Sequence, residues 1–251
     1  MTYSARFSWT VLLPVKVLAR AKSRLAVLAG DRRGDLALAL ASDTVTAVLA
    51  CPEVARVVVV TSDPVAGPLL AALGAIVVAD EPADLADSHG TRGTQGGADV
   101  VPAASDSGVQ DLLNAALRHG AAVAARRWPG TGLAALTADL PAVSPAELAT
   151  ALRAAGTMGT AGTAPGRAAF VPDAAGVGTT LYAVPPGGEF RPLFGGASRA
   201  RHAAAGATEL GLAGLTGLRR DVDTPDDLRE ALALGVGPFT REVAADLFTD
   251  V

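Results

Sequence analysis

Two acidic motifs in this chain place carboxylates where a metal ion could be bound. The first, TADLP (137–141), puts Asp139 directly after an apolar run, and the second, RRDVD (219–223), contains Asp221 and Asp223. A carboxylate at the end of a rigid strand suits a hard divalent cation such as Mg²⁺. We expect Asp139 to be a ligand with one of Asp221 and Asp223, because a strand that ends there turns the two apart. The other would hold Arg219, Arg220 or the loop.

A cationic stretch near the N-terminus could bind phosphate. Both lysines of the chain, Lys16 and Lys22, lie in LLPVKVLARAKSRL (12–25), and no acid precedes Asp31. Their ammonium groups can act as point charges on a polyphosphate. The stretch lacks the glycines of a Walker A loop, and no GxGxxG follows, which disfavours a dinucleotide-dependent dehydrogenase. A solvated loop, with lysine rare through codon usage, is the alternative.

Two glycine-rich segments indicate an anion pocket. PDAAGVGTT (172–180) contains Thr179 and Thr180, and FGGASRARH (194–202) contains Gly195 and Ser198. Backbone amides, hydroxyl groups and the start of a helix capped by Ser198 could converge on an anion. A flexible turn followed by a surface helix is the alternative, and His202 alone indicates little.

The polar residues of GVQDLLN, from Gly108 to Asn114, open an Ala- and Leu-rich segment. Their side chains could read the edge of a base or could cap a helix, and the sequence leaves both interpretations open.

Short apolar runs that alternate with longer Ala/Leu segments must position these groups, and this order predicts an α/β fold with a mostly parallel sheet. Because the runs lack period-2 alternation, the sheet should be covered by helices on both faces. Ligands then bind at the carboxyl ends of the strands. The expected strands are Thr10–Leu13, Arg56–Thr61, Ala75–Ala79, Leu133–Thr137, Ala168–Val171, Thr180–Val184 and Leu218–Val222; the expected helices are Gly34–Ala50, Pro68–Leu73, Val109–Arg126, Pro145–Ala155 and Pro225–Leu234.

Two helix starts are marked by capping residues. Ser144 and Glu147 flank Pro145 in the order of a capping box, and Thr224 with Asp227 repeats the pattern. Ser144 is a better cap than Asp139, which leaves the carboxylate of Asp139 available for a metal.

The length of 251 residues suits a single large domain with one core. The segment 80–106 has six acids, one arginine and no periodicity, so we expect a flexible insertion around 80–107. A second flexible connection is expected at 156–166.

Composition excludes several classes of protein. A net charge of −4 and a pI near 5.4 argue against general nucleic-acid binding. The lone Cys51 excludes an internal disulfide and fits a reducing cytoplasm. The apolar run before Lys16 is too short for a signal peptide, and no stretch approaches the roughly 20 apolar residues of a membrane span.

Taken in order, the motifs resemble one enzyme family. LLPVK with AKSRL, QDLLNAAL, TADLP, PDxxGxGTT, FGxxSxxxH and RRDVDTPDDL extend from Leu12 to Leu228. Together they are similar to the guanylyltransferases of coenzyme F-420 biosynthesis, most of all the actinobacterial enzymes that use phosphoenolpyruvate and more distantly the archaeal enzymes that use 2-phospho-L-lactate. The resemblance implies a Rossmann-like nucleotidyltransferase fold.

The resemblance also implies a reaction and roles for residues. GTP and phosphoenolpyruvate would give enolpyruvoyl-2-diphospho-5'-guanosine and pyrophosphate, and a downstream transferase would take up the reactive product. Among the acids before Thr224-Pro225, Asp223 is favoured over Asp221 as the partner of Asp139 at Mg²⁺. The further roles are phosphate binding by Lys16, Lys22 and Arg24, phosphoenolpyruvate binding by Thr179 or Thr180, Gly195 and Ser198, and guanine contacts between Gly108 and Asn114.

Two other interpretations stay open at this point. The acceptor could be 2-phospho-L-lactate or 3-phosphoglycerate, and the first of these differs from phosphoenolpyruvate by little more than a tetrahedral rather than planar carbon. The chain could also be a nucleotide-binding protein of the same fold without turnover, although both acidic motifs and the lysines argue against this.

Overall fold

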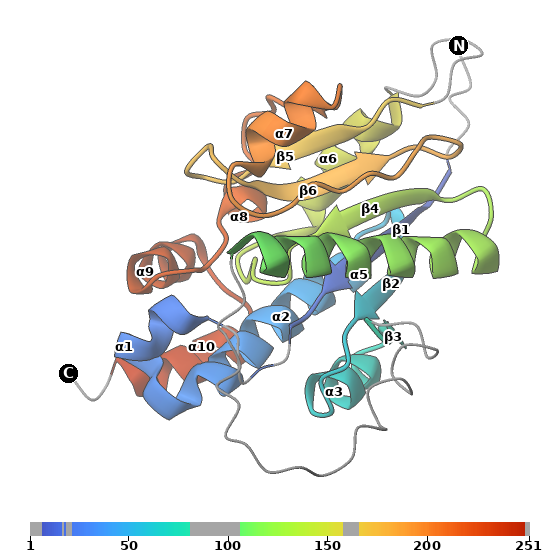
Figure 1. The fold of residues 1–251 in the computed structure, drawn as a ribbon. Coiled ribbons are helices and arrows are strands. Elements are labelled where there is room, and N and C mark those ends of the chain that lie inside the picture. The colour runs from blue at the N-terminus through green and yellow to red at the C-terminus, as the bar shows by residue number, and fades with distance from the viewer. Residues whose placement is uncertain (1–6, 17, 19–21, 81–105, 158–165, 249–251) are drawn as a thin grey trace, which may run out of the picture.

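The computed structural model describes residues 7–16, 18, 22–80, 106–157 and 166–248, and within them a single mixed sheet forms the centre of the molecule (Figure 1). Its order is β3-β2-β1-β4-β6-β5-β7. Strands β1, β2, β3 and β4 run parallel to one another, whereas β6 is antiparallel to both β4 and β5. The strands are β1 (Trp9–Pro14), β2 (Val54–Val60), β3 (Ile76–Val78), β4 (Gly132–Leu136), β5 (Ala169–Pro172), β6 (Thr179–Val184) and β7 (Thr208–Glu209).

Helices cover both faces of this sheet. Helix α5 (Asp106–Arg127) crosses one face, where Leu117 packs with Leu12, Val58 and Tyr182. The other face packs against α2 and α6 through alternate strand residues such as Val11. The further helices are α1 (Ala26–Ala29), α2 (Arg33–Leu49), α3 (Ala66–Ala72), α6 (Pro145–Thr157), α7 (Ser198–Ala204), α8 (Thr216–Arg219), α9 (Pro225–Leu234) and α10 (Pro238–Leu247), with short 3-10 turns at Ser23–Leu25 and Gly30–Arg32.

Burial on both faces explains why the strands read as continuous apolar runs. Val57, Val58, Val59 and Val60 of β2 are each at most 1% exposed. Successive side chains of a strand point to opposite faces, so both faces must be apolar when both carry helices. Gly120 lets α5 approach closely, because a Cβ at that position would lie 2.6 Å from the Val60 side chain.

The antiparallel strand β6 brings a second set of residues to the functional edge. Strand β4 ends at Leu136, which pairs with Leu181. Beyond that pair the Thr137 amide donates to the Thr180 carbonyl at 3.0 Å. The start of β6 at Thr179 therefore lies beside the carboxyl end of β4, next to Asp139.

Most of the expected elements are confirmed, but one strand is wrong. Leu218–Val222 is not a strand: α8 ends at Arg219 and an irregular segment follows. Leu218 and Val222 are both fully buried, but Arg220, which a strand would place on the same face, pairs with Asp227 and Glu230. The sequence analysis also missed α10, although its proline start and the spacing of Phe239, Val243 and Leu247 are typical of an amphipathic helix.

Both predicted capping boxes are confirmed. The Ser144 hydroxyl accepts from the Glu147 amide at 3.2 Å while Glu147 accepts from the Ser144 amide at 3.0 Å. Thr224 and Asp227 make the same reciprocal pair at the start of α9. Most of the two expected flexible segments, 81–105 and 158–165, lies outside the described residues, and the single-domain organisation stays a prediction.

Candidate active site

A cavity of about 680 Å³ opens at the carboxyl edge of the sheet. Its lining comes from the segments after β1 and β4, from the start of α5, and from the turn before α7. Of the residues singled out from the sequence, those in the lining are Lys16, Lys22, Arg24, Asp139, Gly195 and Asp223. The sequence therefore placed these residues at one edge of the sheet correctly, and residues up to 207 positions apart (Lys16 to Asp223) meet there; ligand binding at this edge stays a prediction.

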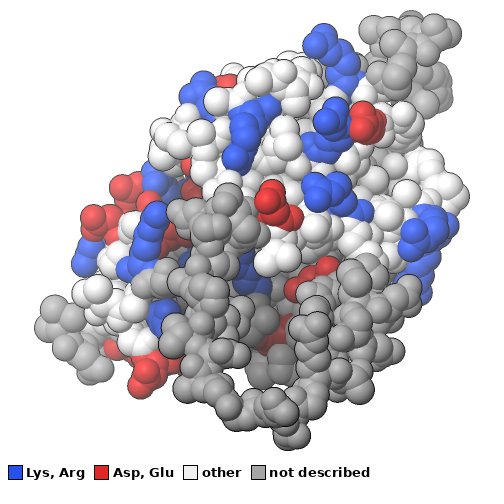
Figure 2. Space-filling model, in the orientation of Figure 1, with Lys and Arg blue, Asp and Glu red and all other residues white. Residues whose placement is uncertain are grey.

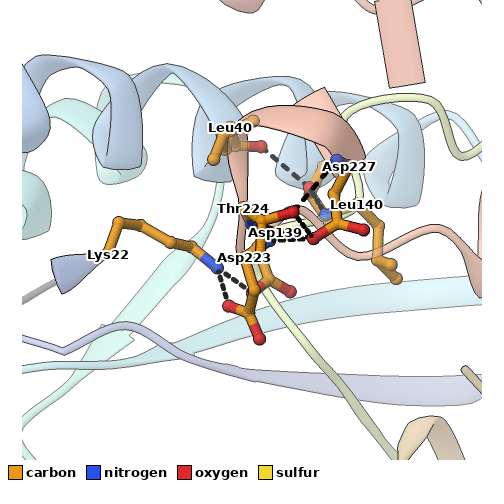
Figure 3. A network of polar contacts seen from close by, with 8 residues as sticks. Lys22, Leu40, Asp139, Leu140, Asp223, Thr224 and Asp227 are labelled. Carbon is orange, nitrogen blue, oxygen red and sulfur yellow. Dashed lines mark hydrogen bonds and ion pairs between the residues drawn. The ribbon is translucent and has the colours of Figure 1, made fainter. Parts of the chain in front are cut away.

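The centre of this cavity is an ammonium group between two carboxylates (Figure 3). Lys22 Nζ donates to Asp139 Oδ2 and, at 2.9 Å, to Asp223 Oδ1. The Asp223 backbone is fixed by the capping box of α9, since its amide donates to Asp227 at 3.2 Å, and the Val222 amide donates to the Asp139 carbonyl at 3.1 Å. The two acidic motifs are thus joined by their backbones as well as by Lys22.

Electrostatics favour the charged forms of this cluster. Burial alone lowers the pKa of Lys22, but Asp139 and Asp223 outweigh it and raise the pKa above its usual range. Burial raises the pKa of Asp223, and Lys22 with smaller effects of Arg24 and Lys16 brings it below the usual value. Lys22 also has a φ of 53°, a conformation uncommon for a residue with a side chain and frequent at functional sites.

Asp221 lies beside this cluster without lining the cavity. Burial and repulsion by Asp139 and Asp223, with a smaller effect of Asp173, raise the pKa of Asp221 to about 7. Of the three alternatives expected for this acid, Arg219, Arg220 and the loop, the two arginines have other partners in the described structure. Arg219 donates to the Asp173 carbonyl at 3.1 Å, and Arg220 pairs with Asp227 and Glu230.

The donor set at the cluster suits a hard cation that also binds phosphate. Asp139 Oδ1 and Thr137 Oγ1 are both buried without a hydrogen-bond partner in the described structure. Such orphaned oxygens require a partner such as a cation or water. The described residues contain no group of three or more His, Cys, Asp and Glu side chains arranged to hold a metal. Mg²⁺ needs no such cage, because it commonly binds one or two carboxylates plus substrate phosphates and water.

The segment after β1 is held by an acid that the sequence analysis missed. Asp63, only 6% exposed, accepts from the amides of Leu18 (2.8 Å), Val65 (2.9 Å) and Ala66 (2.7 Å). It thereby ties the chain between Lys16 and Lys22 to the end of β2. The signal was available, since Asp63 follows the expected strand Arg56–Thr61 as Asp139 follows β4.

The predicted hydroxyl residues lie behind the cavity wall. Thr179 Oγ1 is 3.0 Å from Nδ1 of His202, and Thr180 Oγ1 donates a long 3.5 Å bond to the Val171 carbonyl. Both threonines and Ser198 are buried. Ser198 is the first residue of α7 and not its cap, which is Ala197, so the capping role expected for Ser198 is wrong.

His202 is a neutral, fully buried ring. Its Nε2 accepts from the Leu193 amide at 2.9 Å, so the ring proton sits on Nδ1, toward Thr179. The ring stacks on Tyr182 with centroids 4.7 Å apart and also contacts Phe170 and Phe194. Burial, reinforced by Arg201, lowers its pKa to about 4. The sequence alone gave no way to assign this role.

Asn114 and Gly108 belong to the segment that was expected to lie near guanine, and in the structure Asn114 makes contacts within the protein. Asn114 pairs with the Phe194 backbone, donating to its carbonyl at 3.1 Å and accepting from its amide at 2.9 Å, and it also donates to the Gln110 carbonyl. Its amide is thus engaged in holding the turn before α7. Gly108 lies in the first turn of α5. Guanine contact by this segment stays a prediction.

The described residues on the face of the molecule seen in Figure 1 carry mixed charge. Figure 2 shows blue and red residues interspersed on the face of Figure 1, without one basic patch. None of the helices in the described part of the chain has the length and apolarity to traverse a bilayer.

The fold and the site together define the class of protein. An α/β sheet with lysine and arginine side chains and paired carboxylates at its carboxyl edge is an arrangement that suits a nucleotidyltransferase. In line with this, a solved structure described as a nucleotide-diphospho-sugar transferase from Desulfovibrio desulfuricans matches with a TM-score of 0.52, covering 94% of this chain and 97% of that one. At 14% identity, that likeness concerns the fold alone.

Curated relatives identify the family. The phosphoenolpyruvate guanylyltransferase of Thermomonospora curvata is 53% identical over 244 residues, covering 97% of this chain and 92% of the relative. The enzyme of that name from Streptomyces avermitilis is 54% identical over 240 residues, covering 95% of each chain. No protein-family model matches. The chain belongs to the phosphoenolpyruvate guanylyltransferase family.

Proposed function

We propose that this protein transfers GMP from GTP to phosphoenolpyruvate, giving enolpyruvoyl-2-diphospho-5'-guanosine and pyrophosphate in coenzyme F-420 biosynthesis. The observation that supports this most is the cavity in which Lys22 joins Asp139 and Asp223 at the ligand edge of the sheet. The names of the relatives supply the donor nucleotide's base and the acceptor.

The chemistry requires positioning and charge neutralisation rather than proton transfer. A phosphate oxygen of the acceptor forms a bond to the α-phosphorus of GTP, and the bond from that phosphorus to the bridging oxygen of pyrophosphate breaks. The acceptor phosphate is already anionic at neutral pH, so no general base is needed. Two like unit charges 4 Å apart repel by about 4 kcal/mol at an effective dielectric of 20, and the cations of the site must offset this.

Lys16, Lys22 and Arg24 are the side chains proposed to bind the GTP phosphates. All three line the cavity, and Lys16 and Arg24 are exposed to it. Lys22 already bonds to both carboxylates, so it would shift onto the phosphates when a cation takes its place. Lys16 and Lys22 are also proposed as catalytic residues, because they neutralise charge on the reacting phosphates.

Asp139 and Asp223 are proposed to hold Mg²⁺. Both carboxylates face the cavity, and the orphaned Asp139 Oδ1 has room for a further partner. When bound, Mg²⁺ would neutralise phosphate charge and hold the α-phosphate in line. Asp221 is the alternative to Asp223 as the second metal ligand. Burial and the nearby carboxylates of Asp139 and Asp223 raise the pKa of Asp221, but this residue does not line the cavity.

The acceptor and the base are assigned to the other wall. Gly195 in the cavity lining, together with Thr179 or Thr180 and Ser198, which are buried behind it, is proposed to bind phosphoenolpyruvate; the start of α5 from Gly108 to Asn114 is proposed to lie near guanine. Hand-over of the product to a downstream transferase and a cytoplasmic location complete the proposal. The mixed surface charge gives no reason to add a nucleic-acid partner.

Pyrophosphate release provides the test. The protein is incubated with GTP, Mg²⁺ and, in turn, phosphoenolpyruvate, 2-phospho-L-lactate or 3-phosphoglycerate, and we expect the first to give the highest kcat/KM. Preference for another acid would move the function to that acceptor, and no release with any of them would favour a binding protein without turnover.

Asp139→Asn tests the metal role separately. The amide keeps the shape of the side chain but removes its charge, and turnover should fall by roughly 100-fold or more. Asp226→Asn, on the exposed side of α9, is the matched control and should keep normal turnover. Near-normal activity of Asp139→Asn at saturating Mg²⁺ would reject the metal role.

A further inference from the structure

The turn before α7 is held by one partly buried arginine, Arg201. Arg201 Nη2 donates to the carbonyl oxygens of Leu193 and Phe194, each at 3.2 Å, and also to that of Gly195. Its Nη1 donates to Gln110 Oε1 at 3.2 Å. A guanidinium group has donors only, so three consecutive carbonyls and the side-chain oxygen of Gln110 must all face it.

This arrangement fixes where the amides of the turn point. In a planar trans peptide the N–H is opposite to the C=O of the same unit. Since the Phe194 and Gly195 carbonyls face Arg201, the amides of Gly195 and Gly196 face away from it. The hydrogen bonds of the described residues include no acceptor for either amide, and both glycines line the cavity.

Both glycines have a backbone that few other residues adopt. Their φ values are 97° and 42°, in the left-handed region. Two successive amides of such a turn form a concave group of donors that attracts an anion. A Cβ on Gly195 would lie 2.3 Å from Gln110 Cγ, so the space in front of the turn is closed on that side by Gln110.

The arginines themselves do not reach the cavity. Arg199 pairs with Glu209 and donates to the Gly176 carbonyl at 3.0 Å, and Arg201 is engaged as above. Neither residue lines the cavity. Any effect of Arg201 on the acceptor must therefore pass through the backbone that it holds.

We propose that Arg201 is a positioning residue for the acceptor: it holds the carbonyls of the turn so that the Gly195 and Gly196 amides bind the carboxylate of the three-carbon acid. This rests on the proposed function, in which Gly195 contacts the acceptor. The phosphate of that acid must lie at the GTP phosphates and the Asp139 cluster, which leaves the carboxylate for the turn. Gln110, whose oxygen faces Arg201, presents its NH₂ group beside Gly196 as a further donor.

The experiment crosses an enzyme variant with a substrate lacking the carboxylate. Steady-state pyrophosphate release is measured for wild type and Arg201→Met with phosphoenolpyruvate and with vinyl phosphate, the enol phosphate without a carboxyl group. In Arg201→Met the KM for phosphoenolpyruvate should rise about 10- to 100-fold, the effect of losing hydrogen bonds to a charged group. The preference for phosphoenolpyruvate over vinyl phosphate should shrink by a similar factor, and the KM for GTP should stay within about twofold.

Controls separate this role from a merely structural one. Arg199→Met removes an arginine of the same helix. It should leave unchanged the KM for phosphoenolpyruvate, the preference over vinyl phosphate and the KM for GTP. Arg201→Lys can still donate to some of the carbonyls and should recover part of the affinity, and it also serves if the methionine variant does not fold. An unchanged KM for phosphoenolpyruvate, or an equal loss for phosphoenolpyruvate, vinyl phosphate and GTP, would overturn the proposal. Absence of transfer to phosphoenolpyruvate in wild type would instead refute the proposed function.

Discussion

Replacing Lys22 with methionine should strengthen metal binding to the nucleotide-free protein although it weakens the reaction. The Lys22 ammonium group lies between the carboxylates of Asp139 and Asp223, the side chains proposed to bind Mg²⁺. A divalent cation must displace this ammonium to reach both carboxylates. Methionine keeps an unbranched apolar stem and removes the charge, so the competitor is lost while the packing is largely kept.

The size of the effect follows from distance and exposure. Lys22 Nζ is 2.9 Å from Asp223 Oδ1, and unit charges at that distance attract by about 6 kcal/mol at an effective dielectric of 20. The side chains are 11% exposed for Lys22, 22% for Asp139 and 52% for Asp223, so solvent screening and the desolvation of the ammonium cancel most of this. A net competition of about 1 to 3 kcal/mol remains, which corresponds to roughly 5- to 150-fold in the metal dissociation constant.

Mn²⁺ can be titrated into nucleotide-free protein and its free fraction measured by electron paramagnetic resonance. We expect Lys22→Met to bind Mn²⁺ more tightly than wild type by the factor above, and its KM for GTP to increase. Lys16→Met is the matched control: Lys16 lines the same cavity but has no ion pair among the described residues, so its Mn²⁺ affinity should change by less than about twofold. Equal or weaker Mn²⁺ binding by Lys22→Met would refute the shared site.

Two further predictions concern the walls of the cavity. Burial lowers the pKa of His202 from 6.5 to about 4, so the folded state binds this proton more weakly than the unfolded state, and the stability from the neutral ring is lost as pH falls from about 6.5 toward 4. The loss amounts to about 3 kcal/mol of the free energy of unfolding. Measured by urea unfolding at pH 7 and 4.5, this free energy should depend less on pH in His202→Gln than in wild type. An equal pH dependence in the two proteins would contradict the prediction. Asp63→Asn should raise the KM for GTP about 3- to 10-fold by weakening the acceptor for the Leu18 amide, with the KM for phosphoenolpyruvate unchanged; steady-state kinetics in which both constants move together would argue for general unfolding instead.

Much of the fold could be predicted because the sheet is buried on both faces. Runs such as Val57 to Val60 have no polar face, and a helix pattern follows most of those in the first half of the chain, so strands and their carboxyl ends could be placed there. The failure at Leu218–Val222 has a physical cause: in LRRDV only the two ends are apolar, and Arg220, which a strand would place on the face of both, pairs with Asp227 and Glu230 instead. The antiparallel direction of β6 depends on how the chain returns after β5, which no local pattern encodes.

Individual residues of the site could be predicted where their placement depends on local sequence alone, but their contacts with distant residues could not. Asp139 follows a strand end, and a strand end is a feature of local sequence. The bond from Lys22 to Asp223 joins residues 201 positions apart, and nothing in either motif specifies its partner. At Asn114 the sequence left open whether the polar residues read a base or cap a helix, and it did not indicate the contact that the structure shows, in which Asn114 holds the Phe194 backbone.

Arg201 shows why residue type alone misassigns such sites. A basic residue next to an anion pocket suggests direct binding of the acid, yet the guanidinium group faces carbonyl oxygens on the far side of the turn. Under the proposed function, a charged side chain that reached the carboxylate directly would also attract the phosphates of GTP in the same cavity. Two neutral amides fixed in place by an arginine behind them can distinguish the smaller carboxylate by geometry. On this argument, the positive charge at the GTP end and the neutral donors at the acceptor end keep the two anionic substrates in their own halves of the cavity.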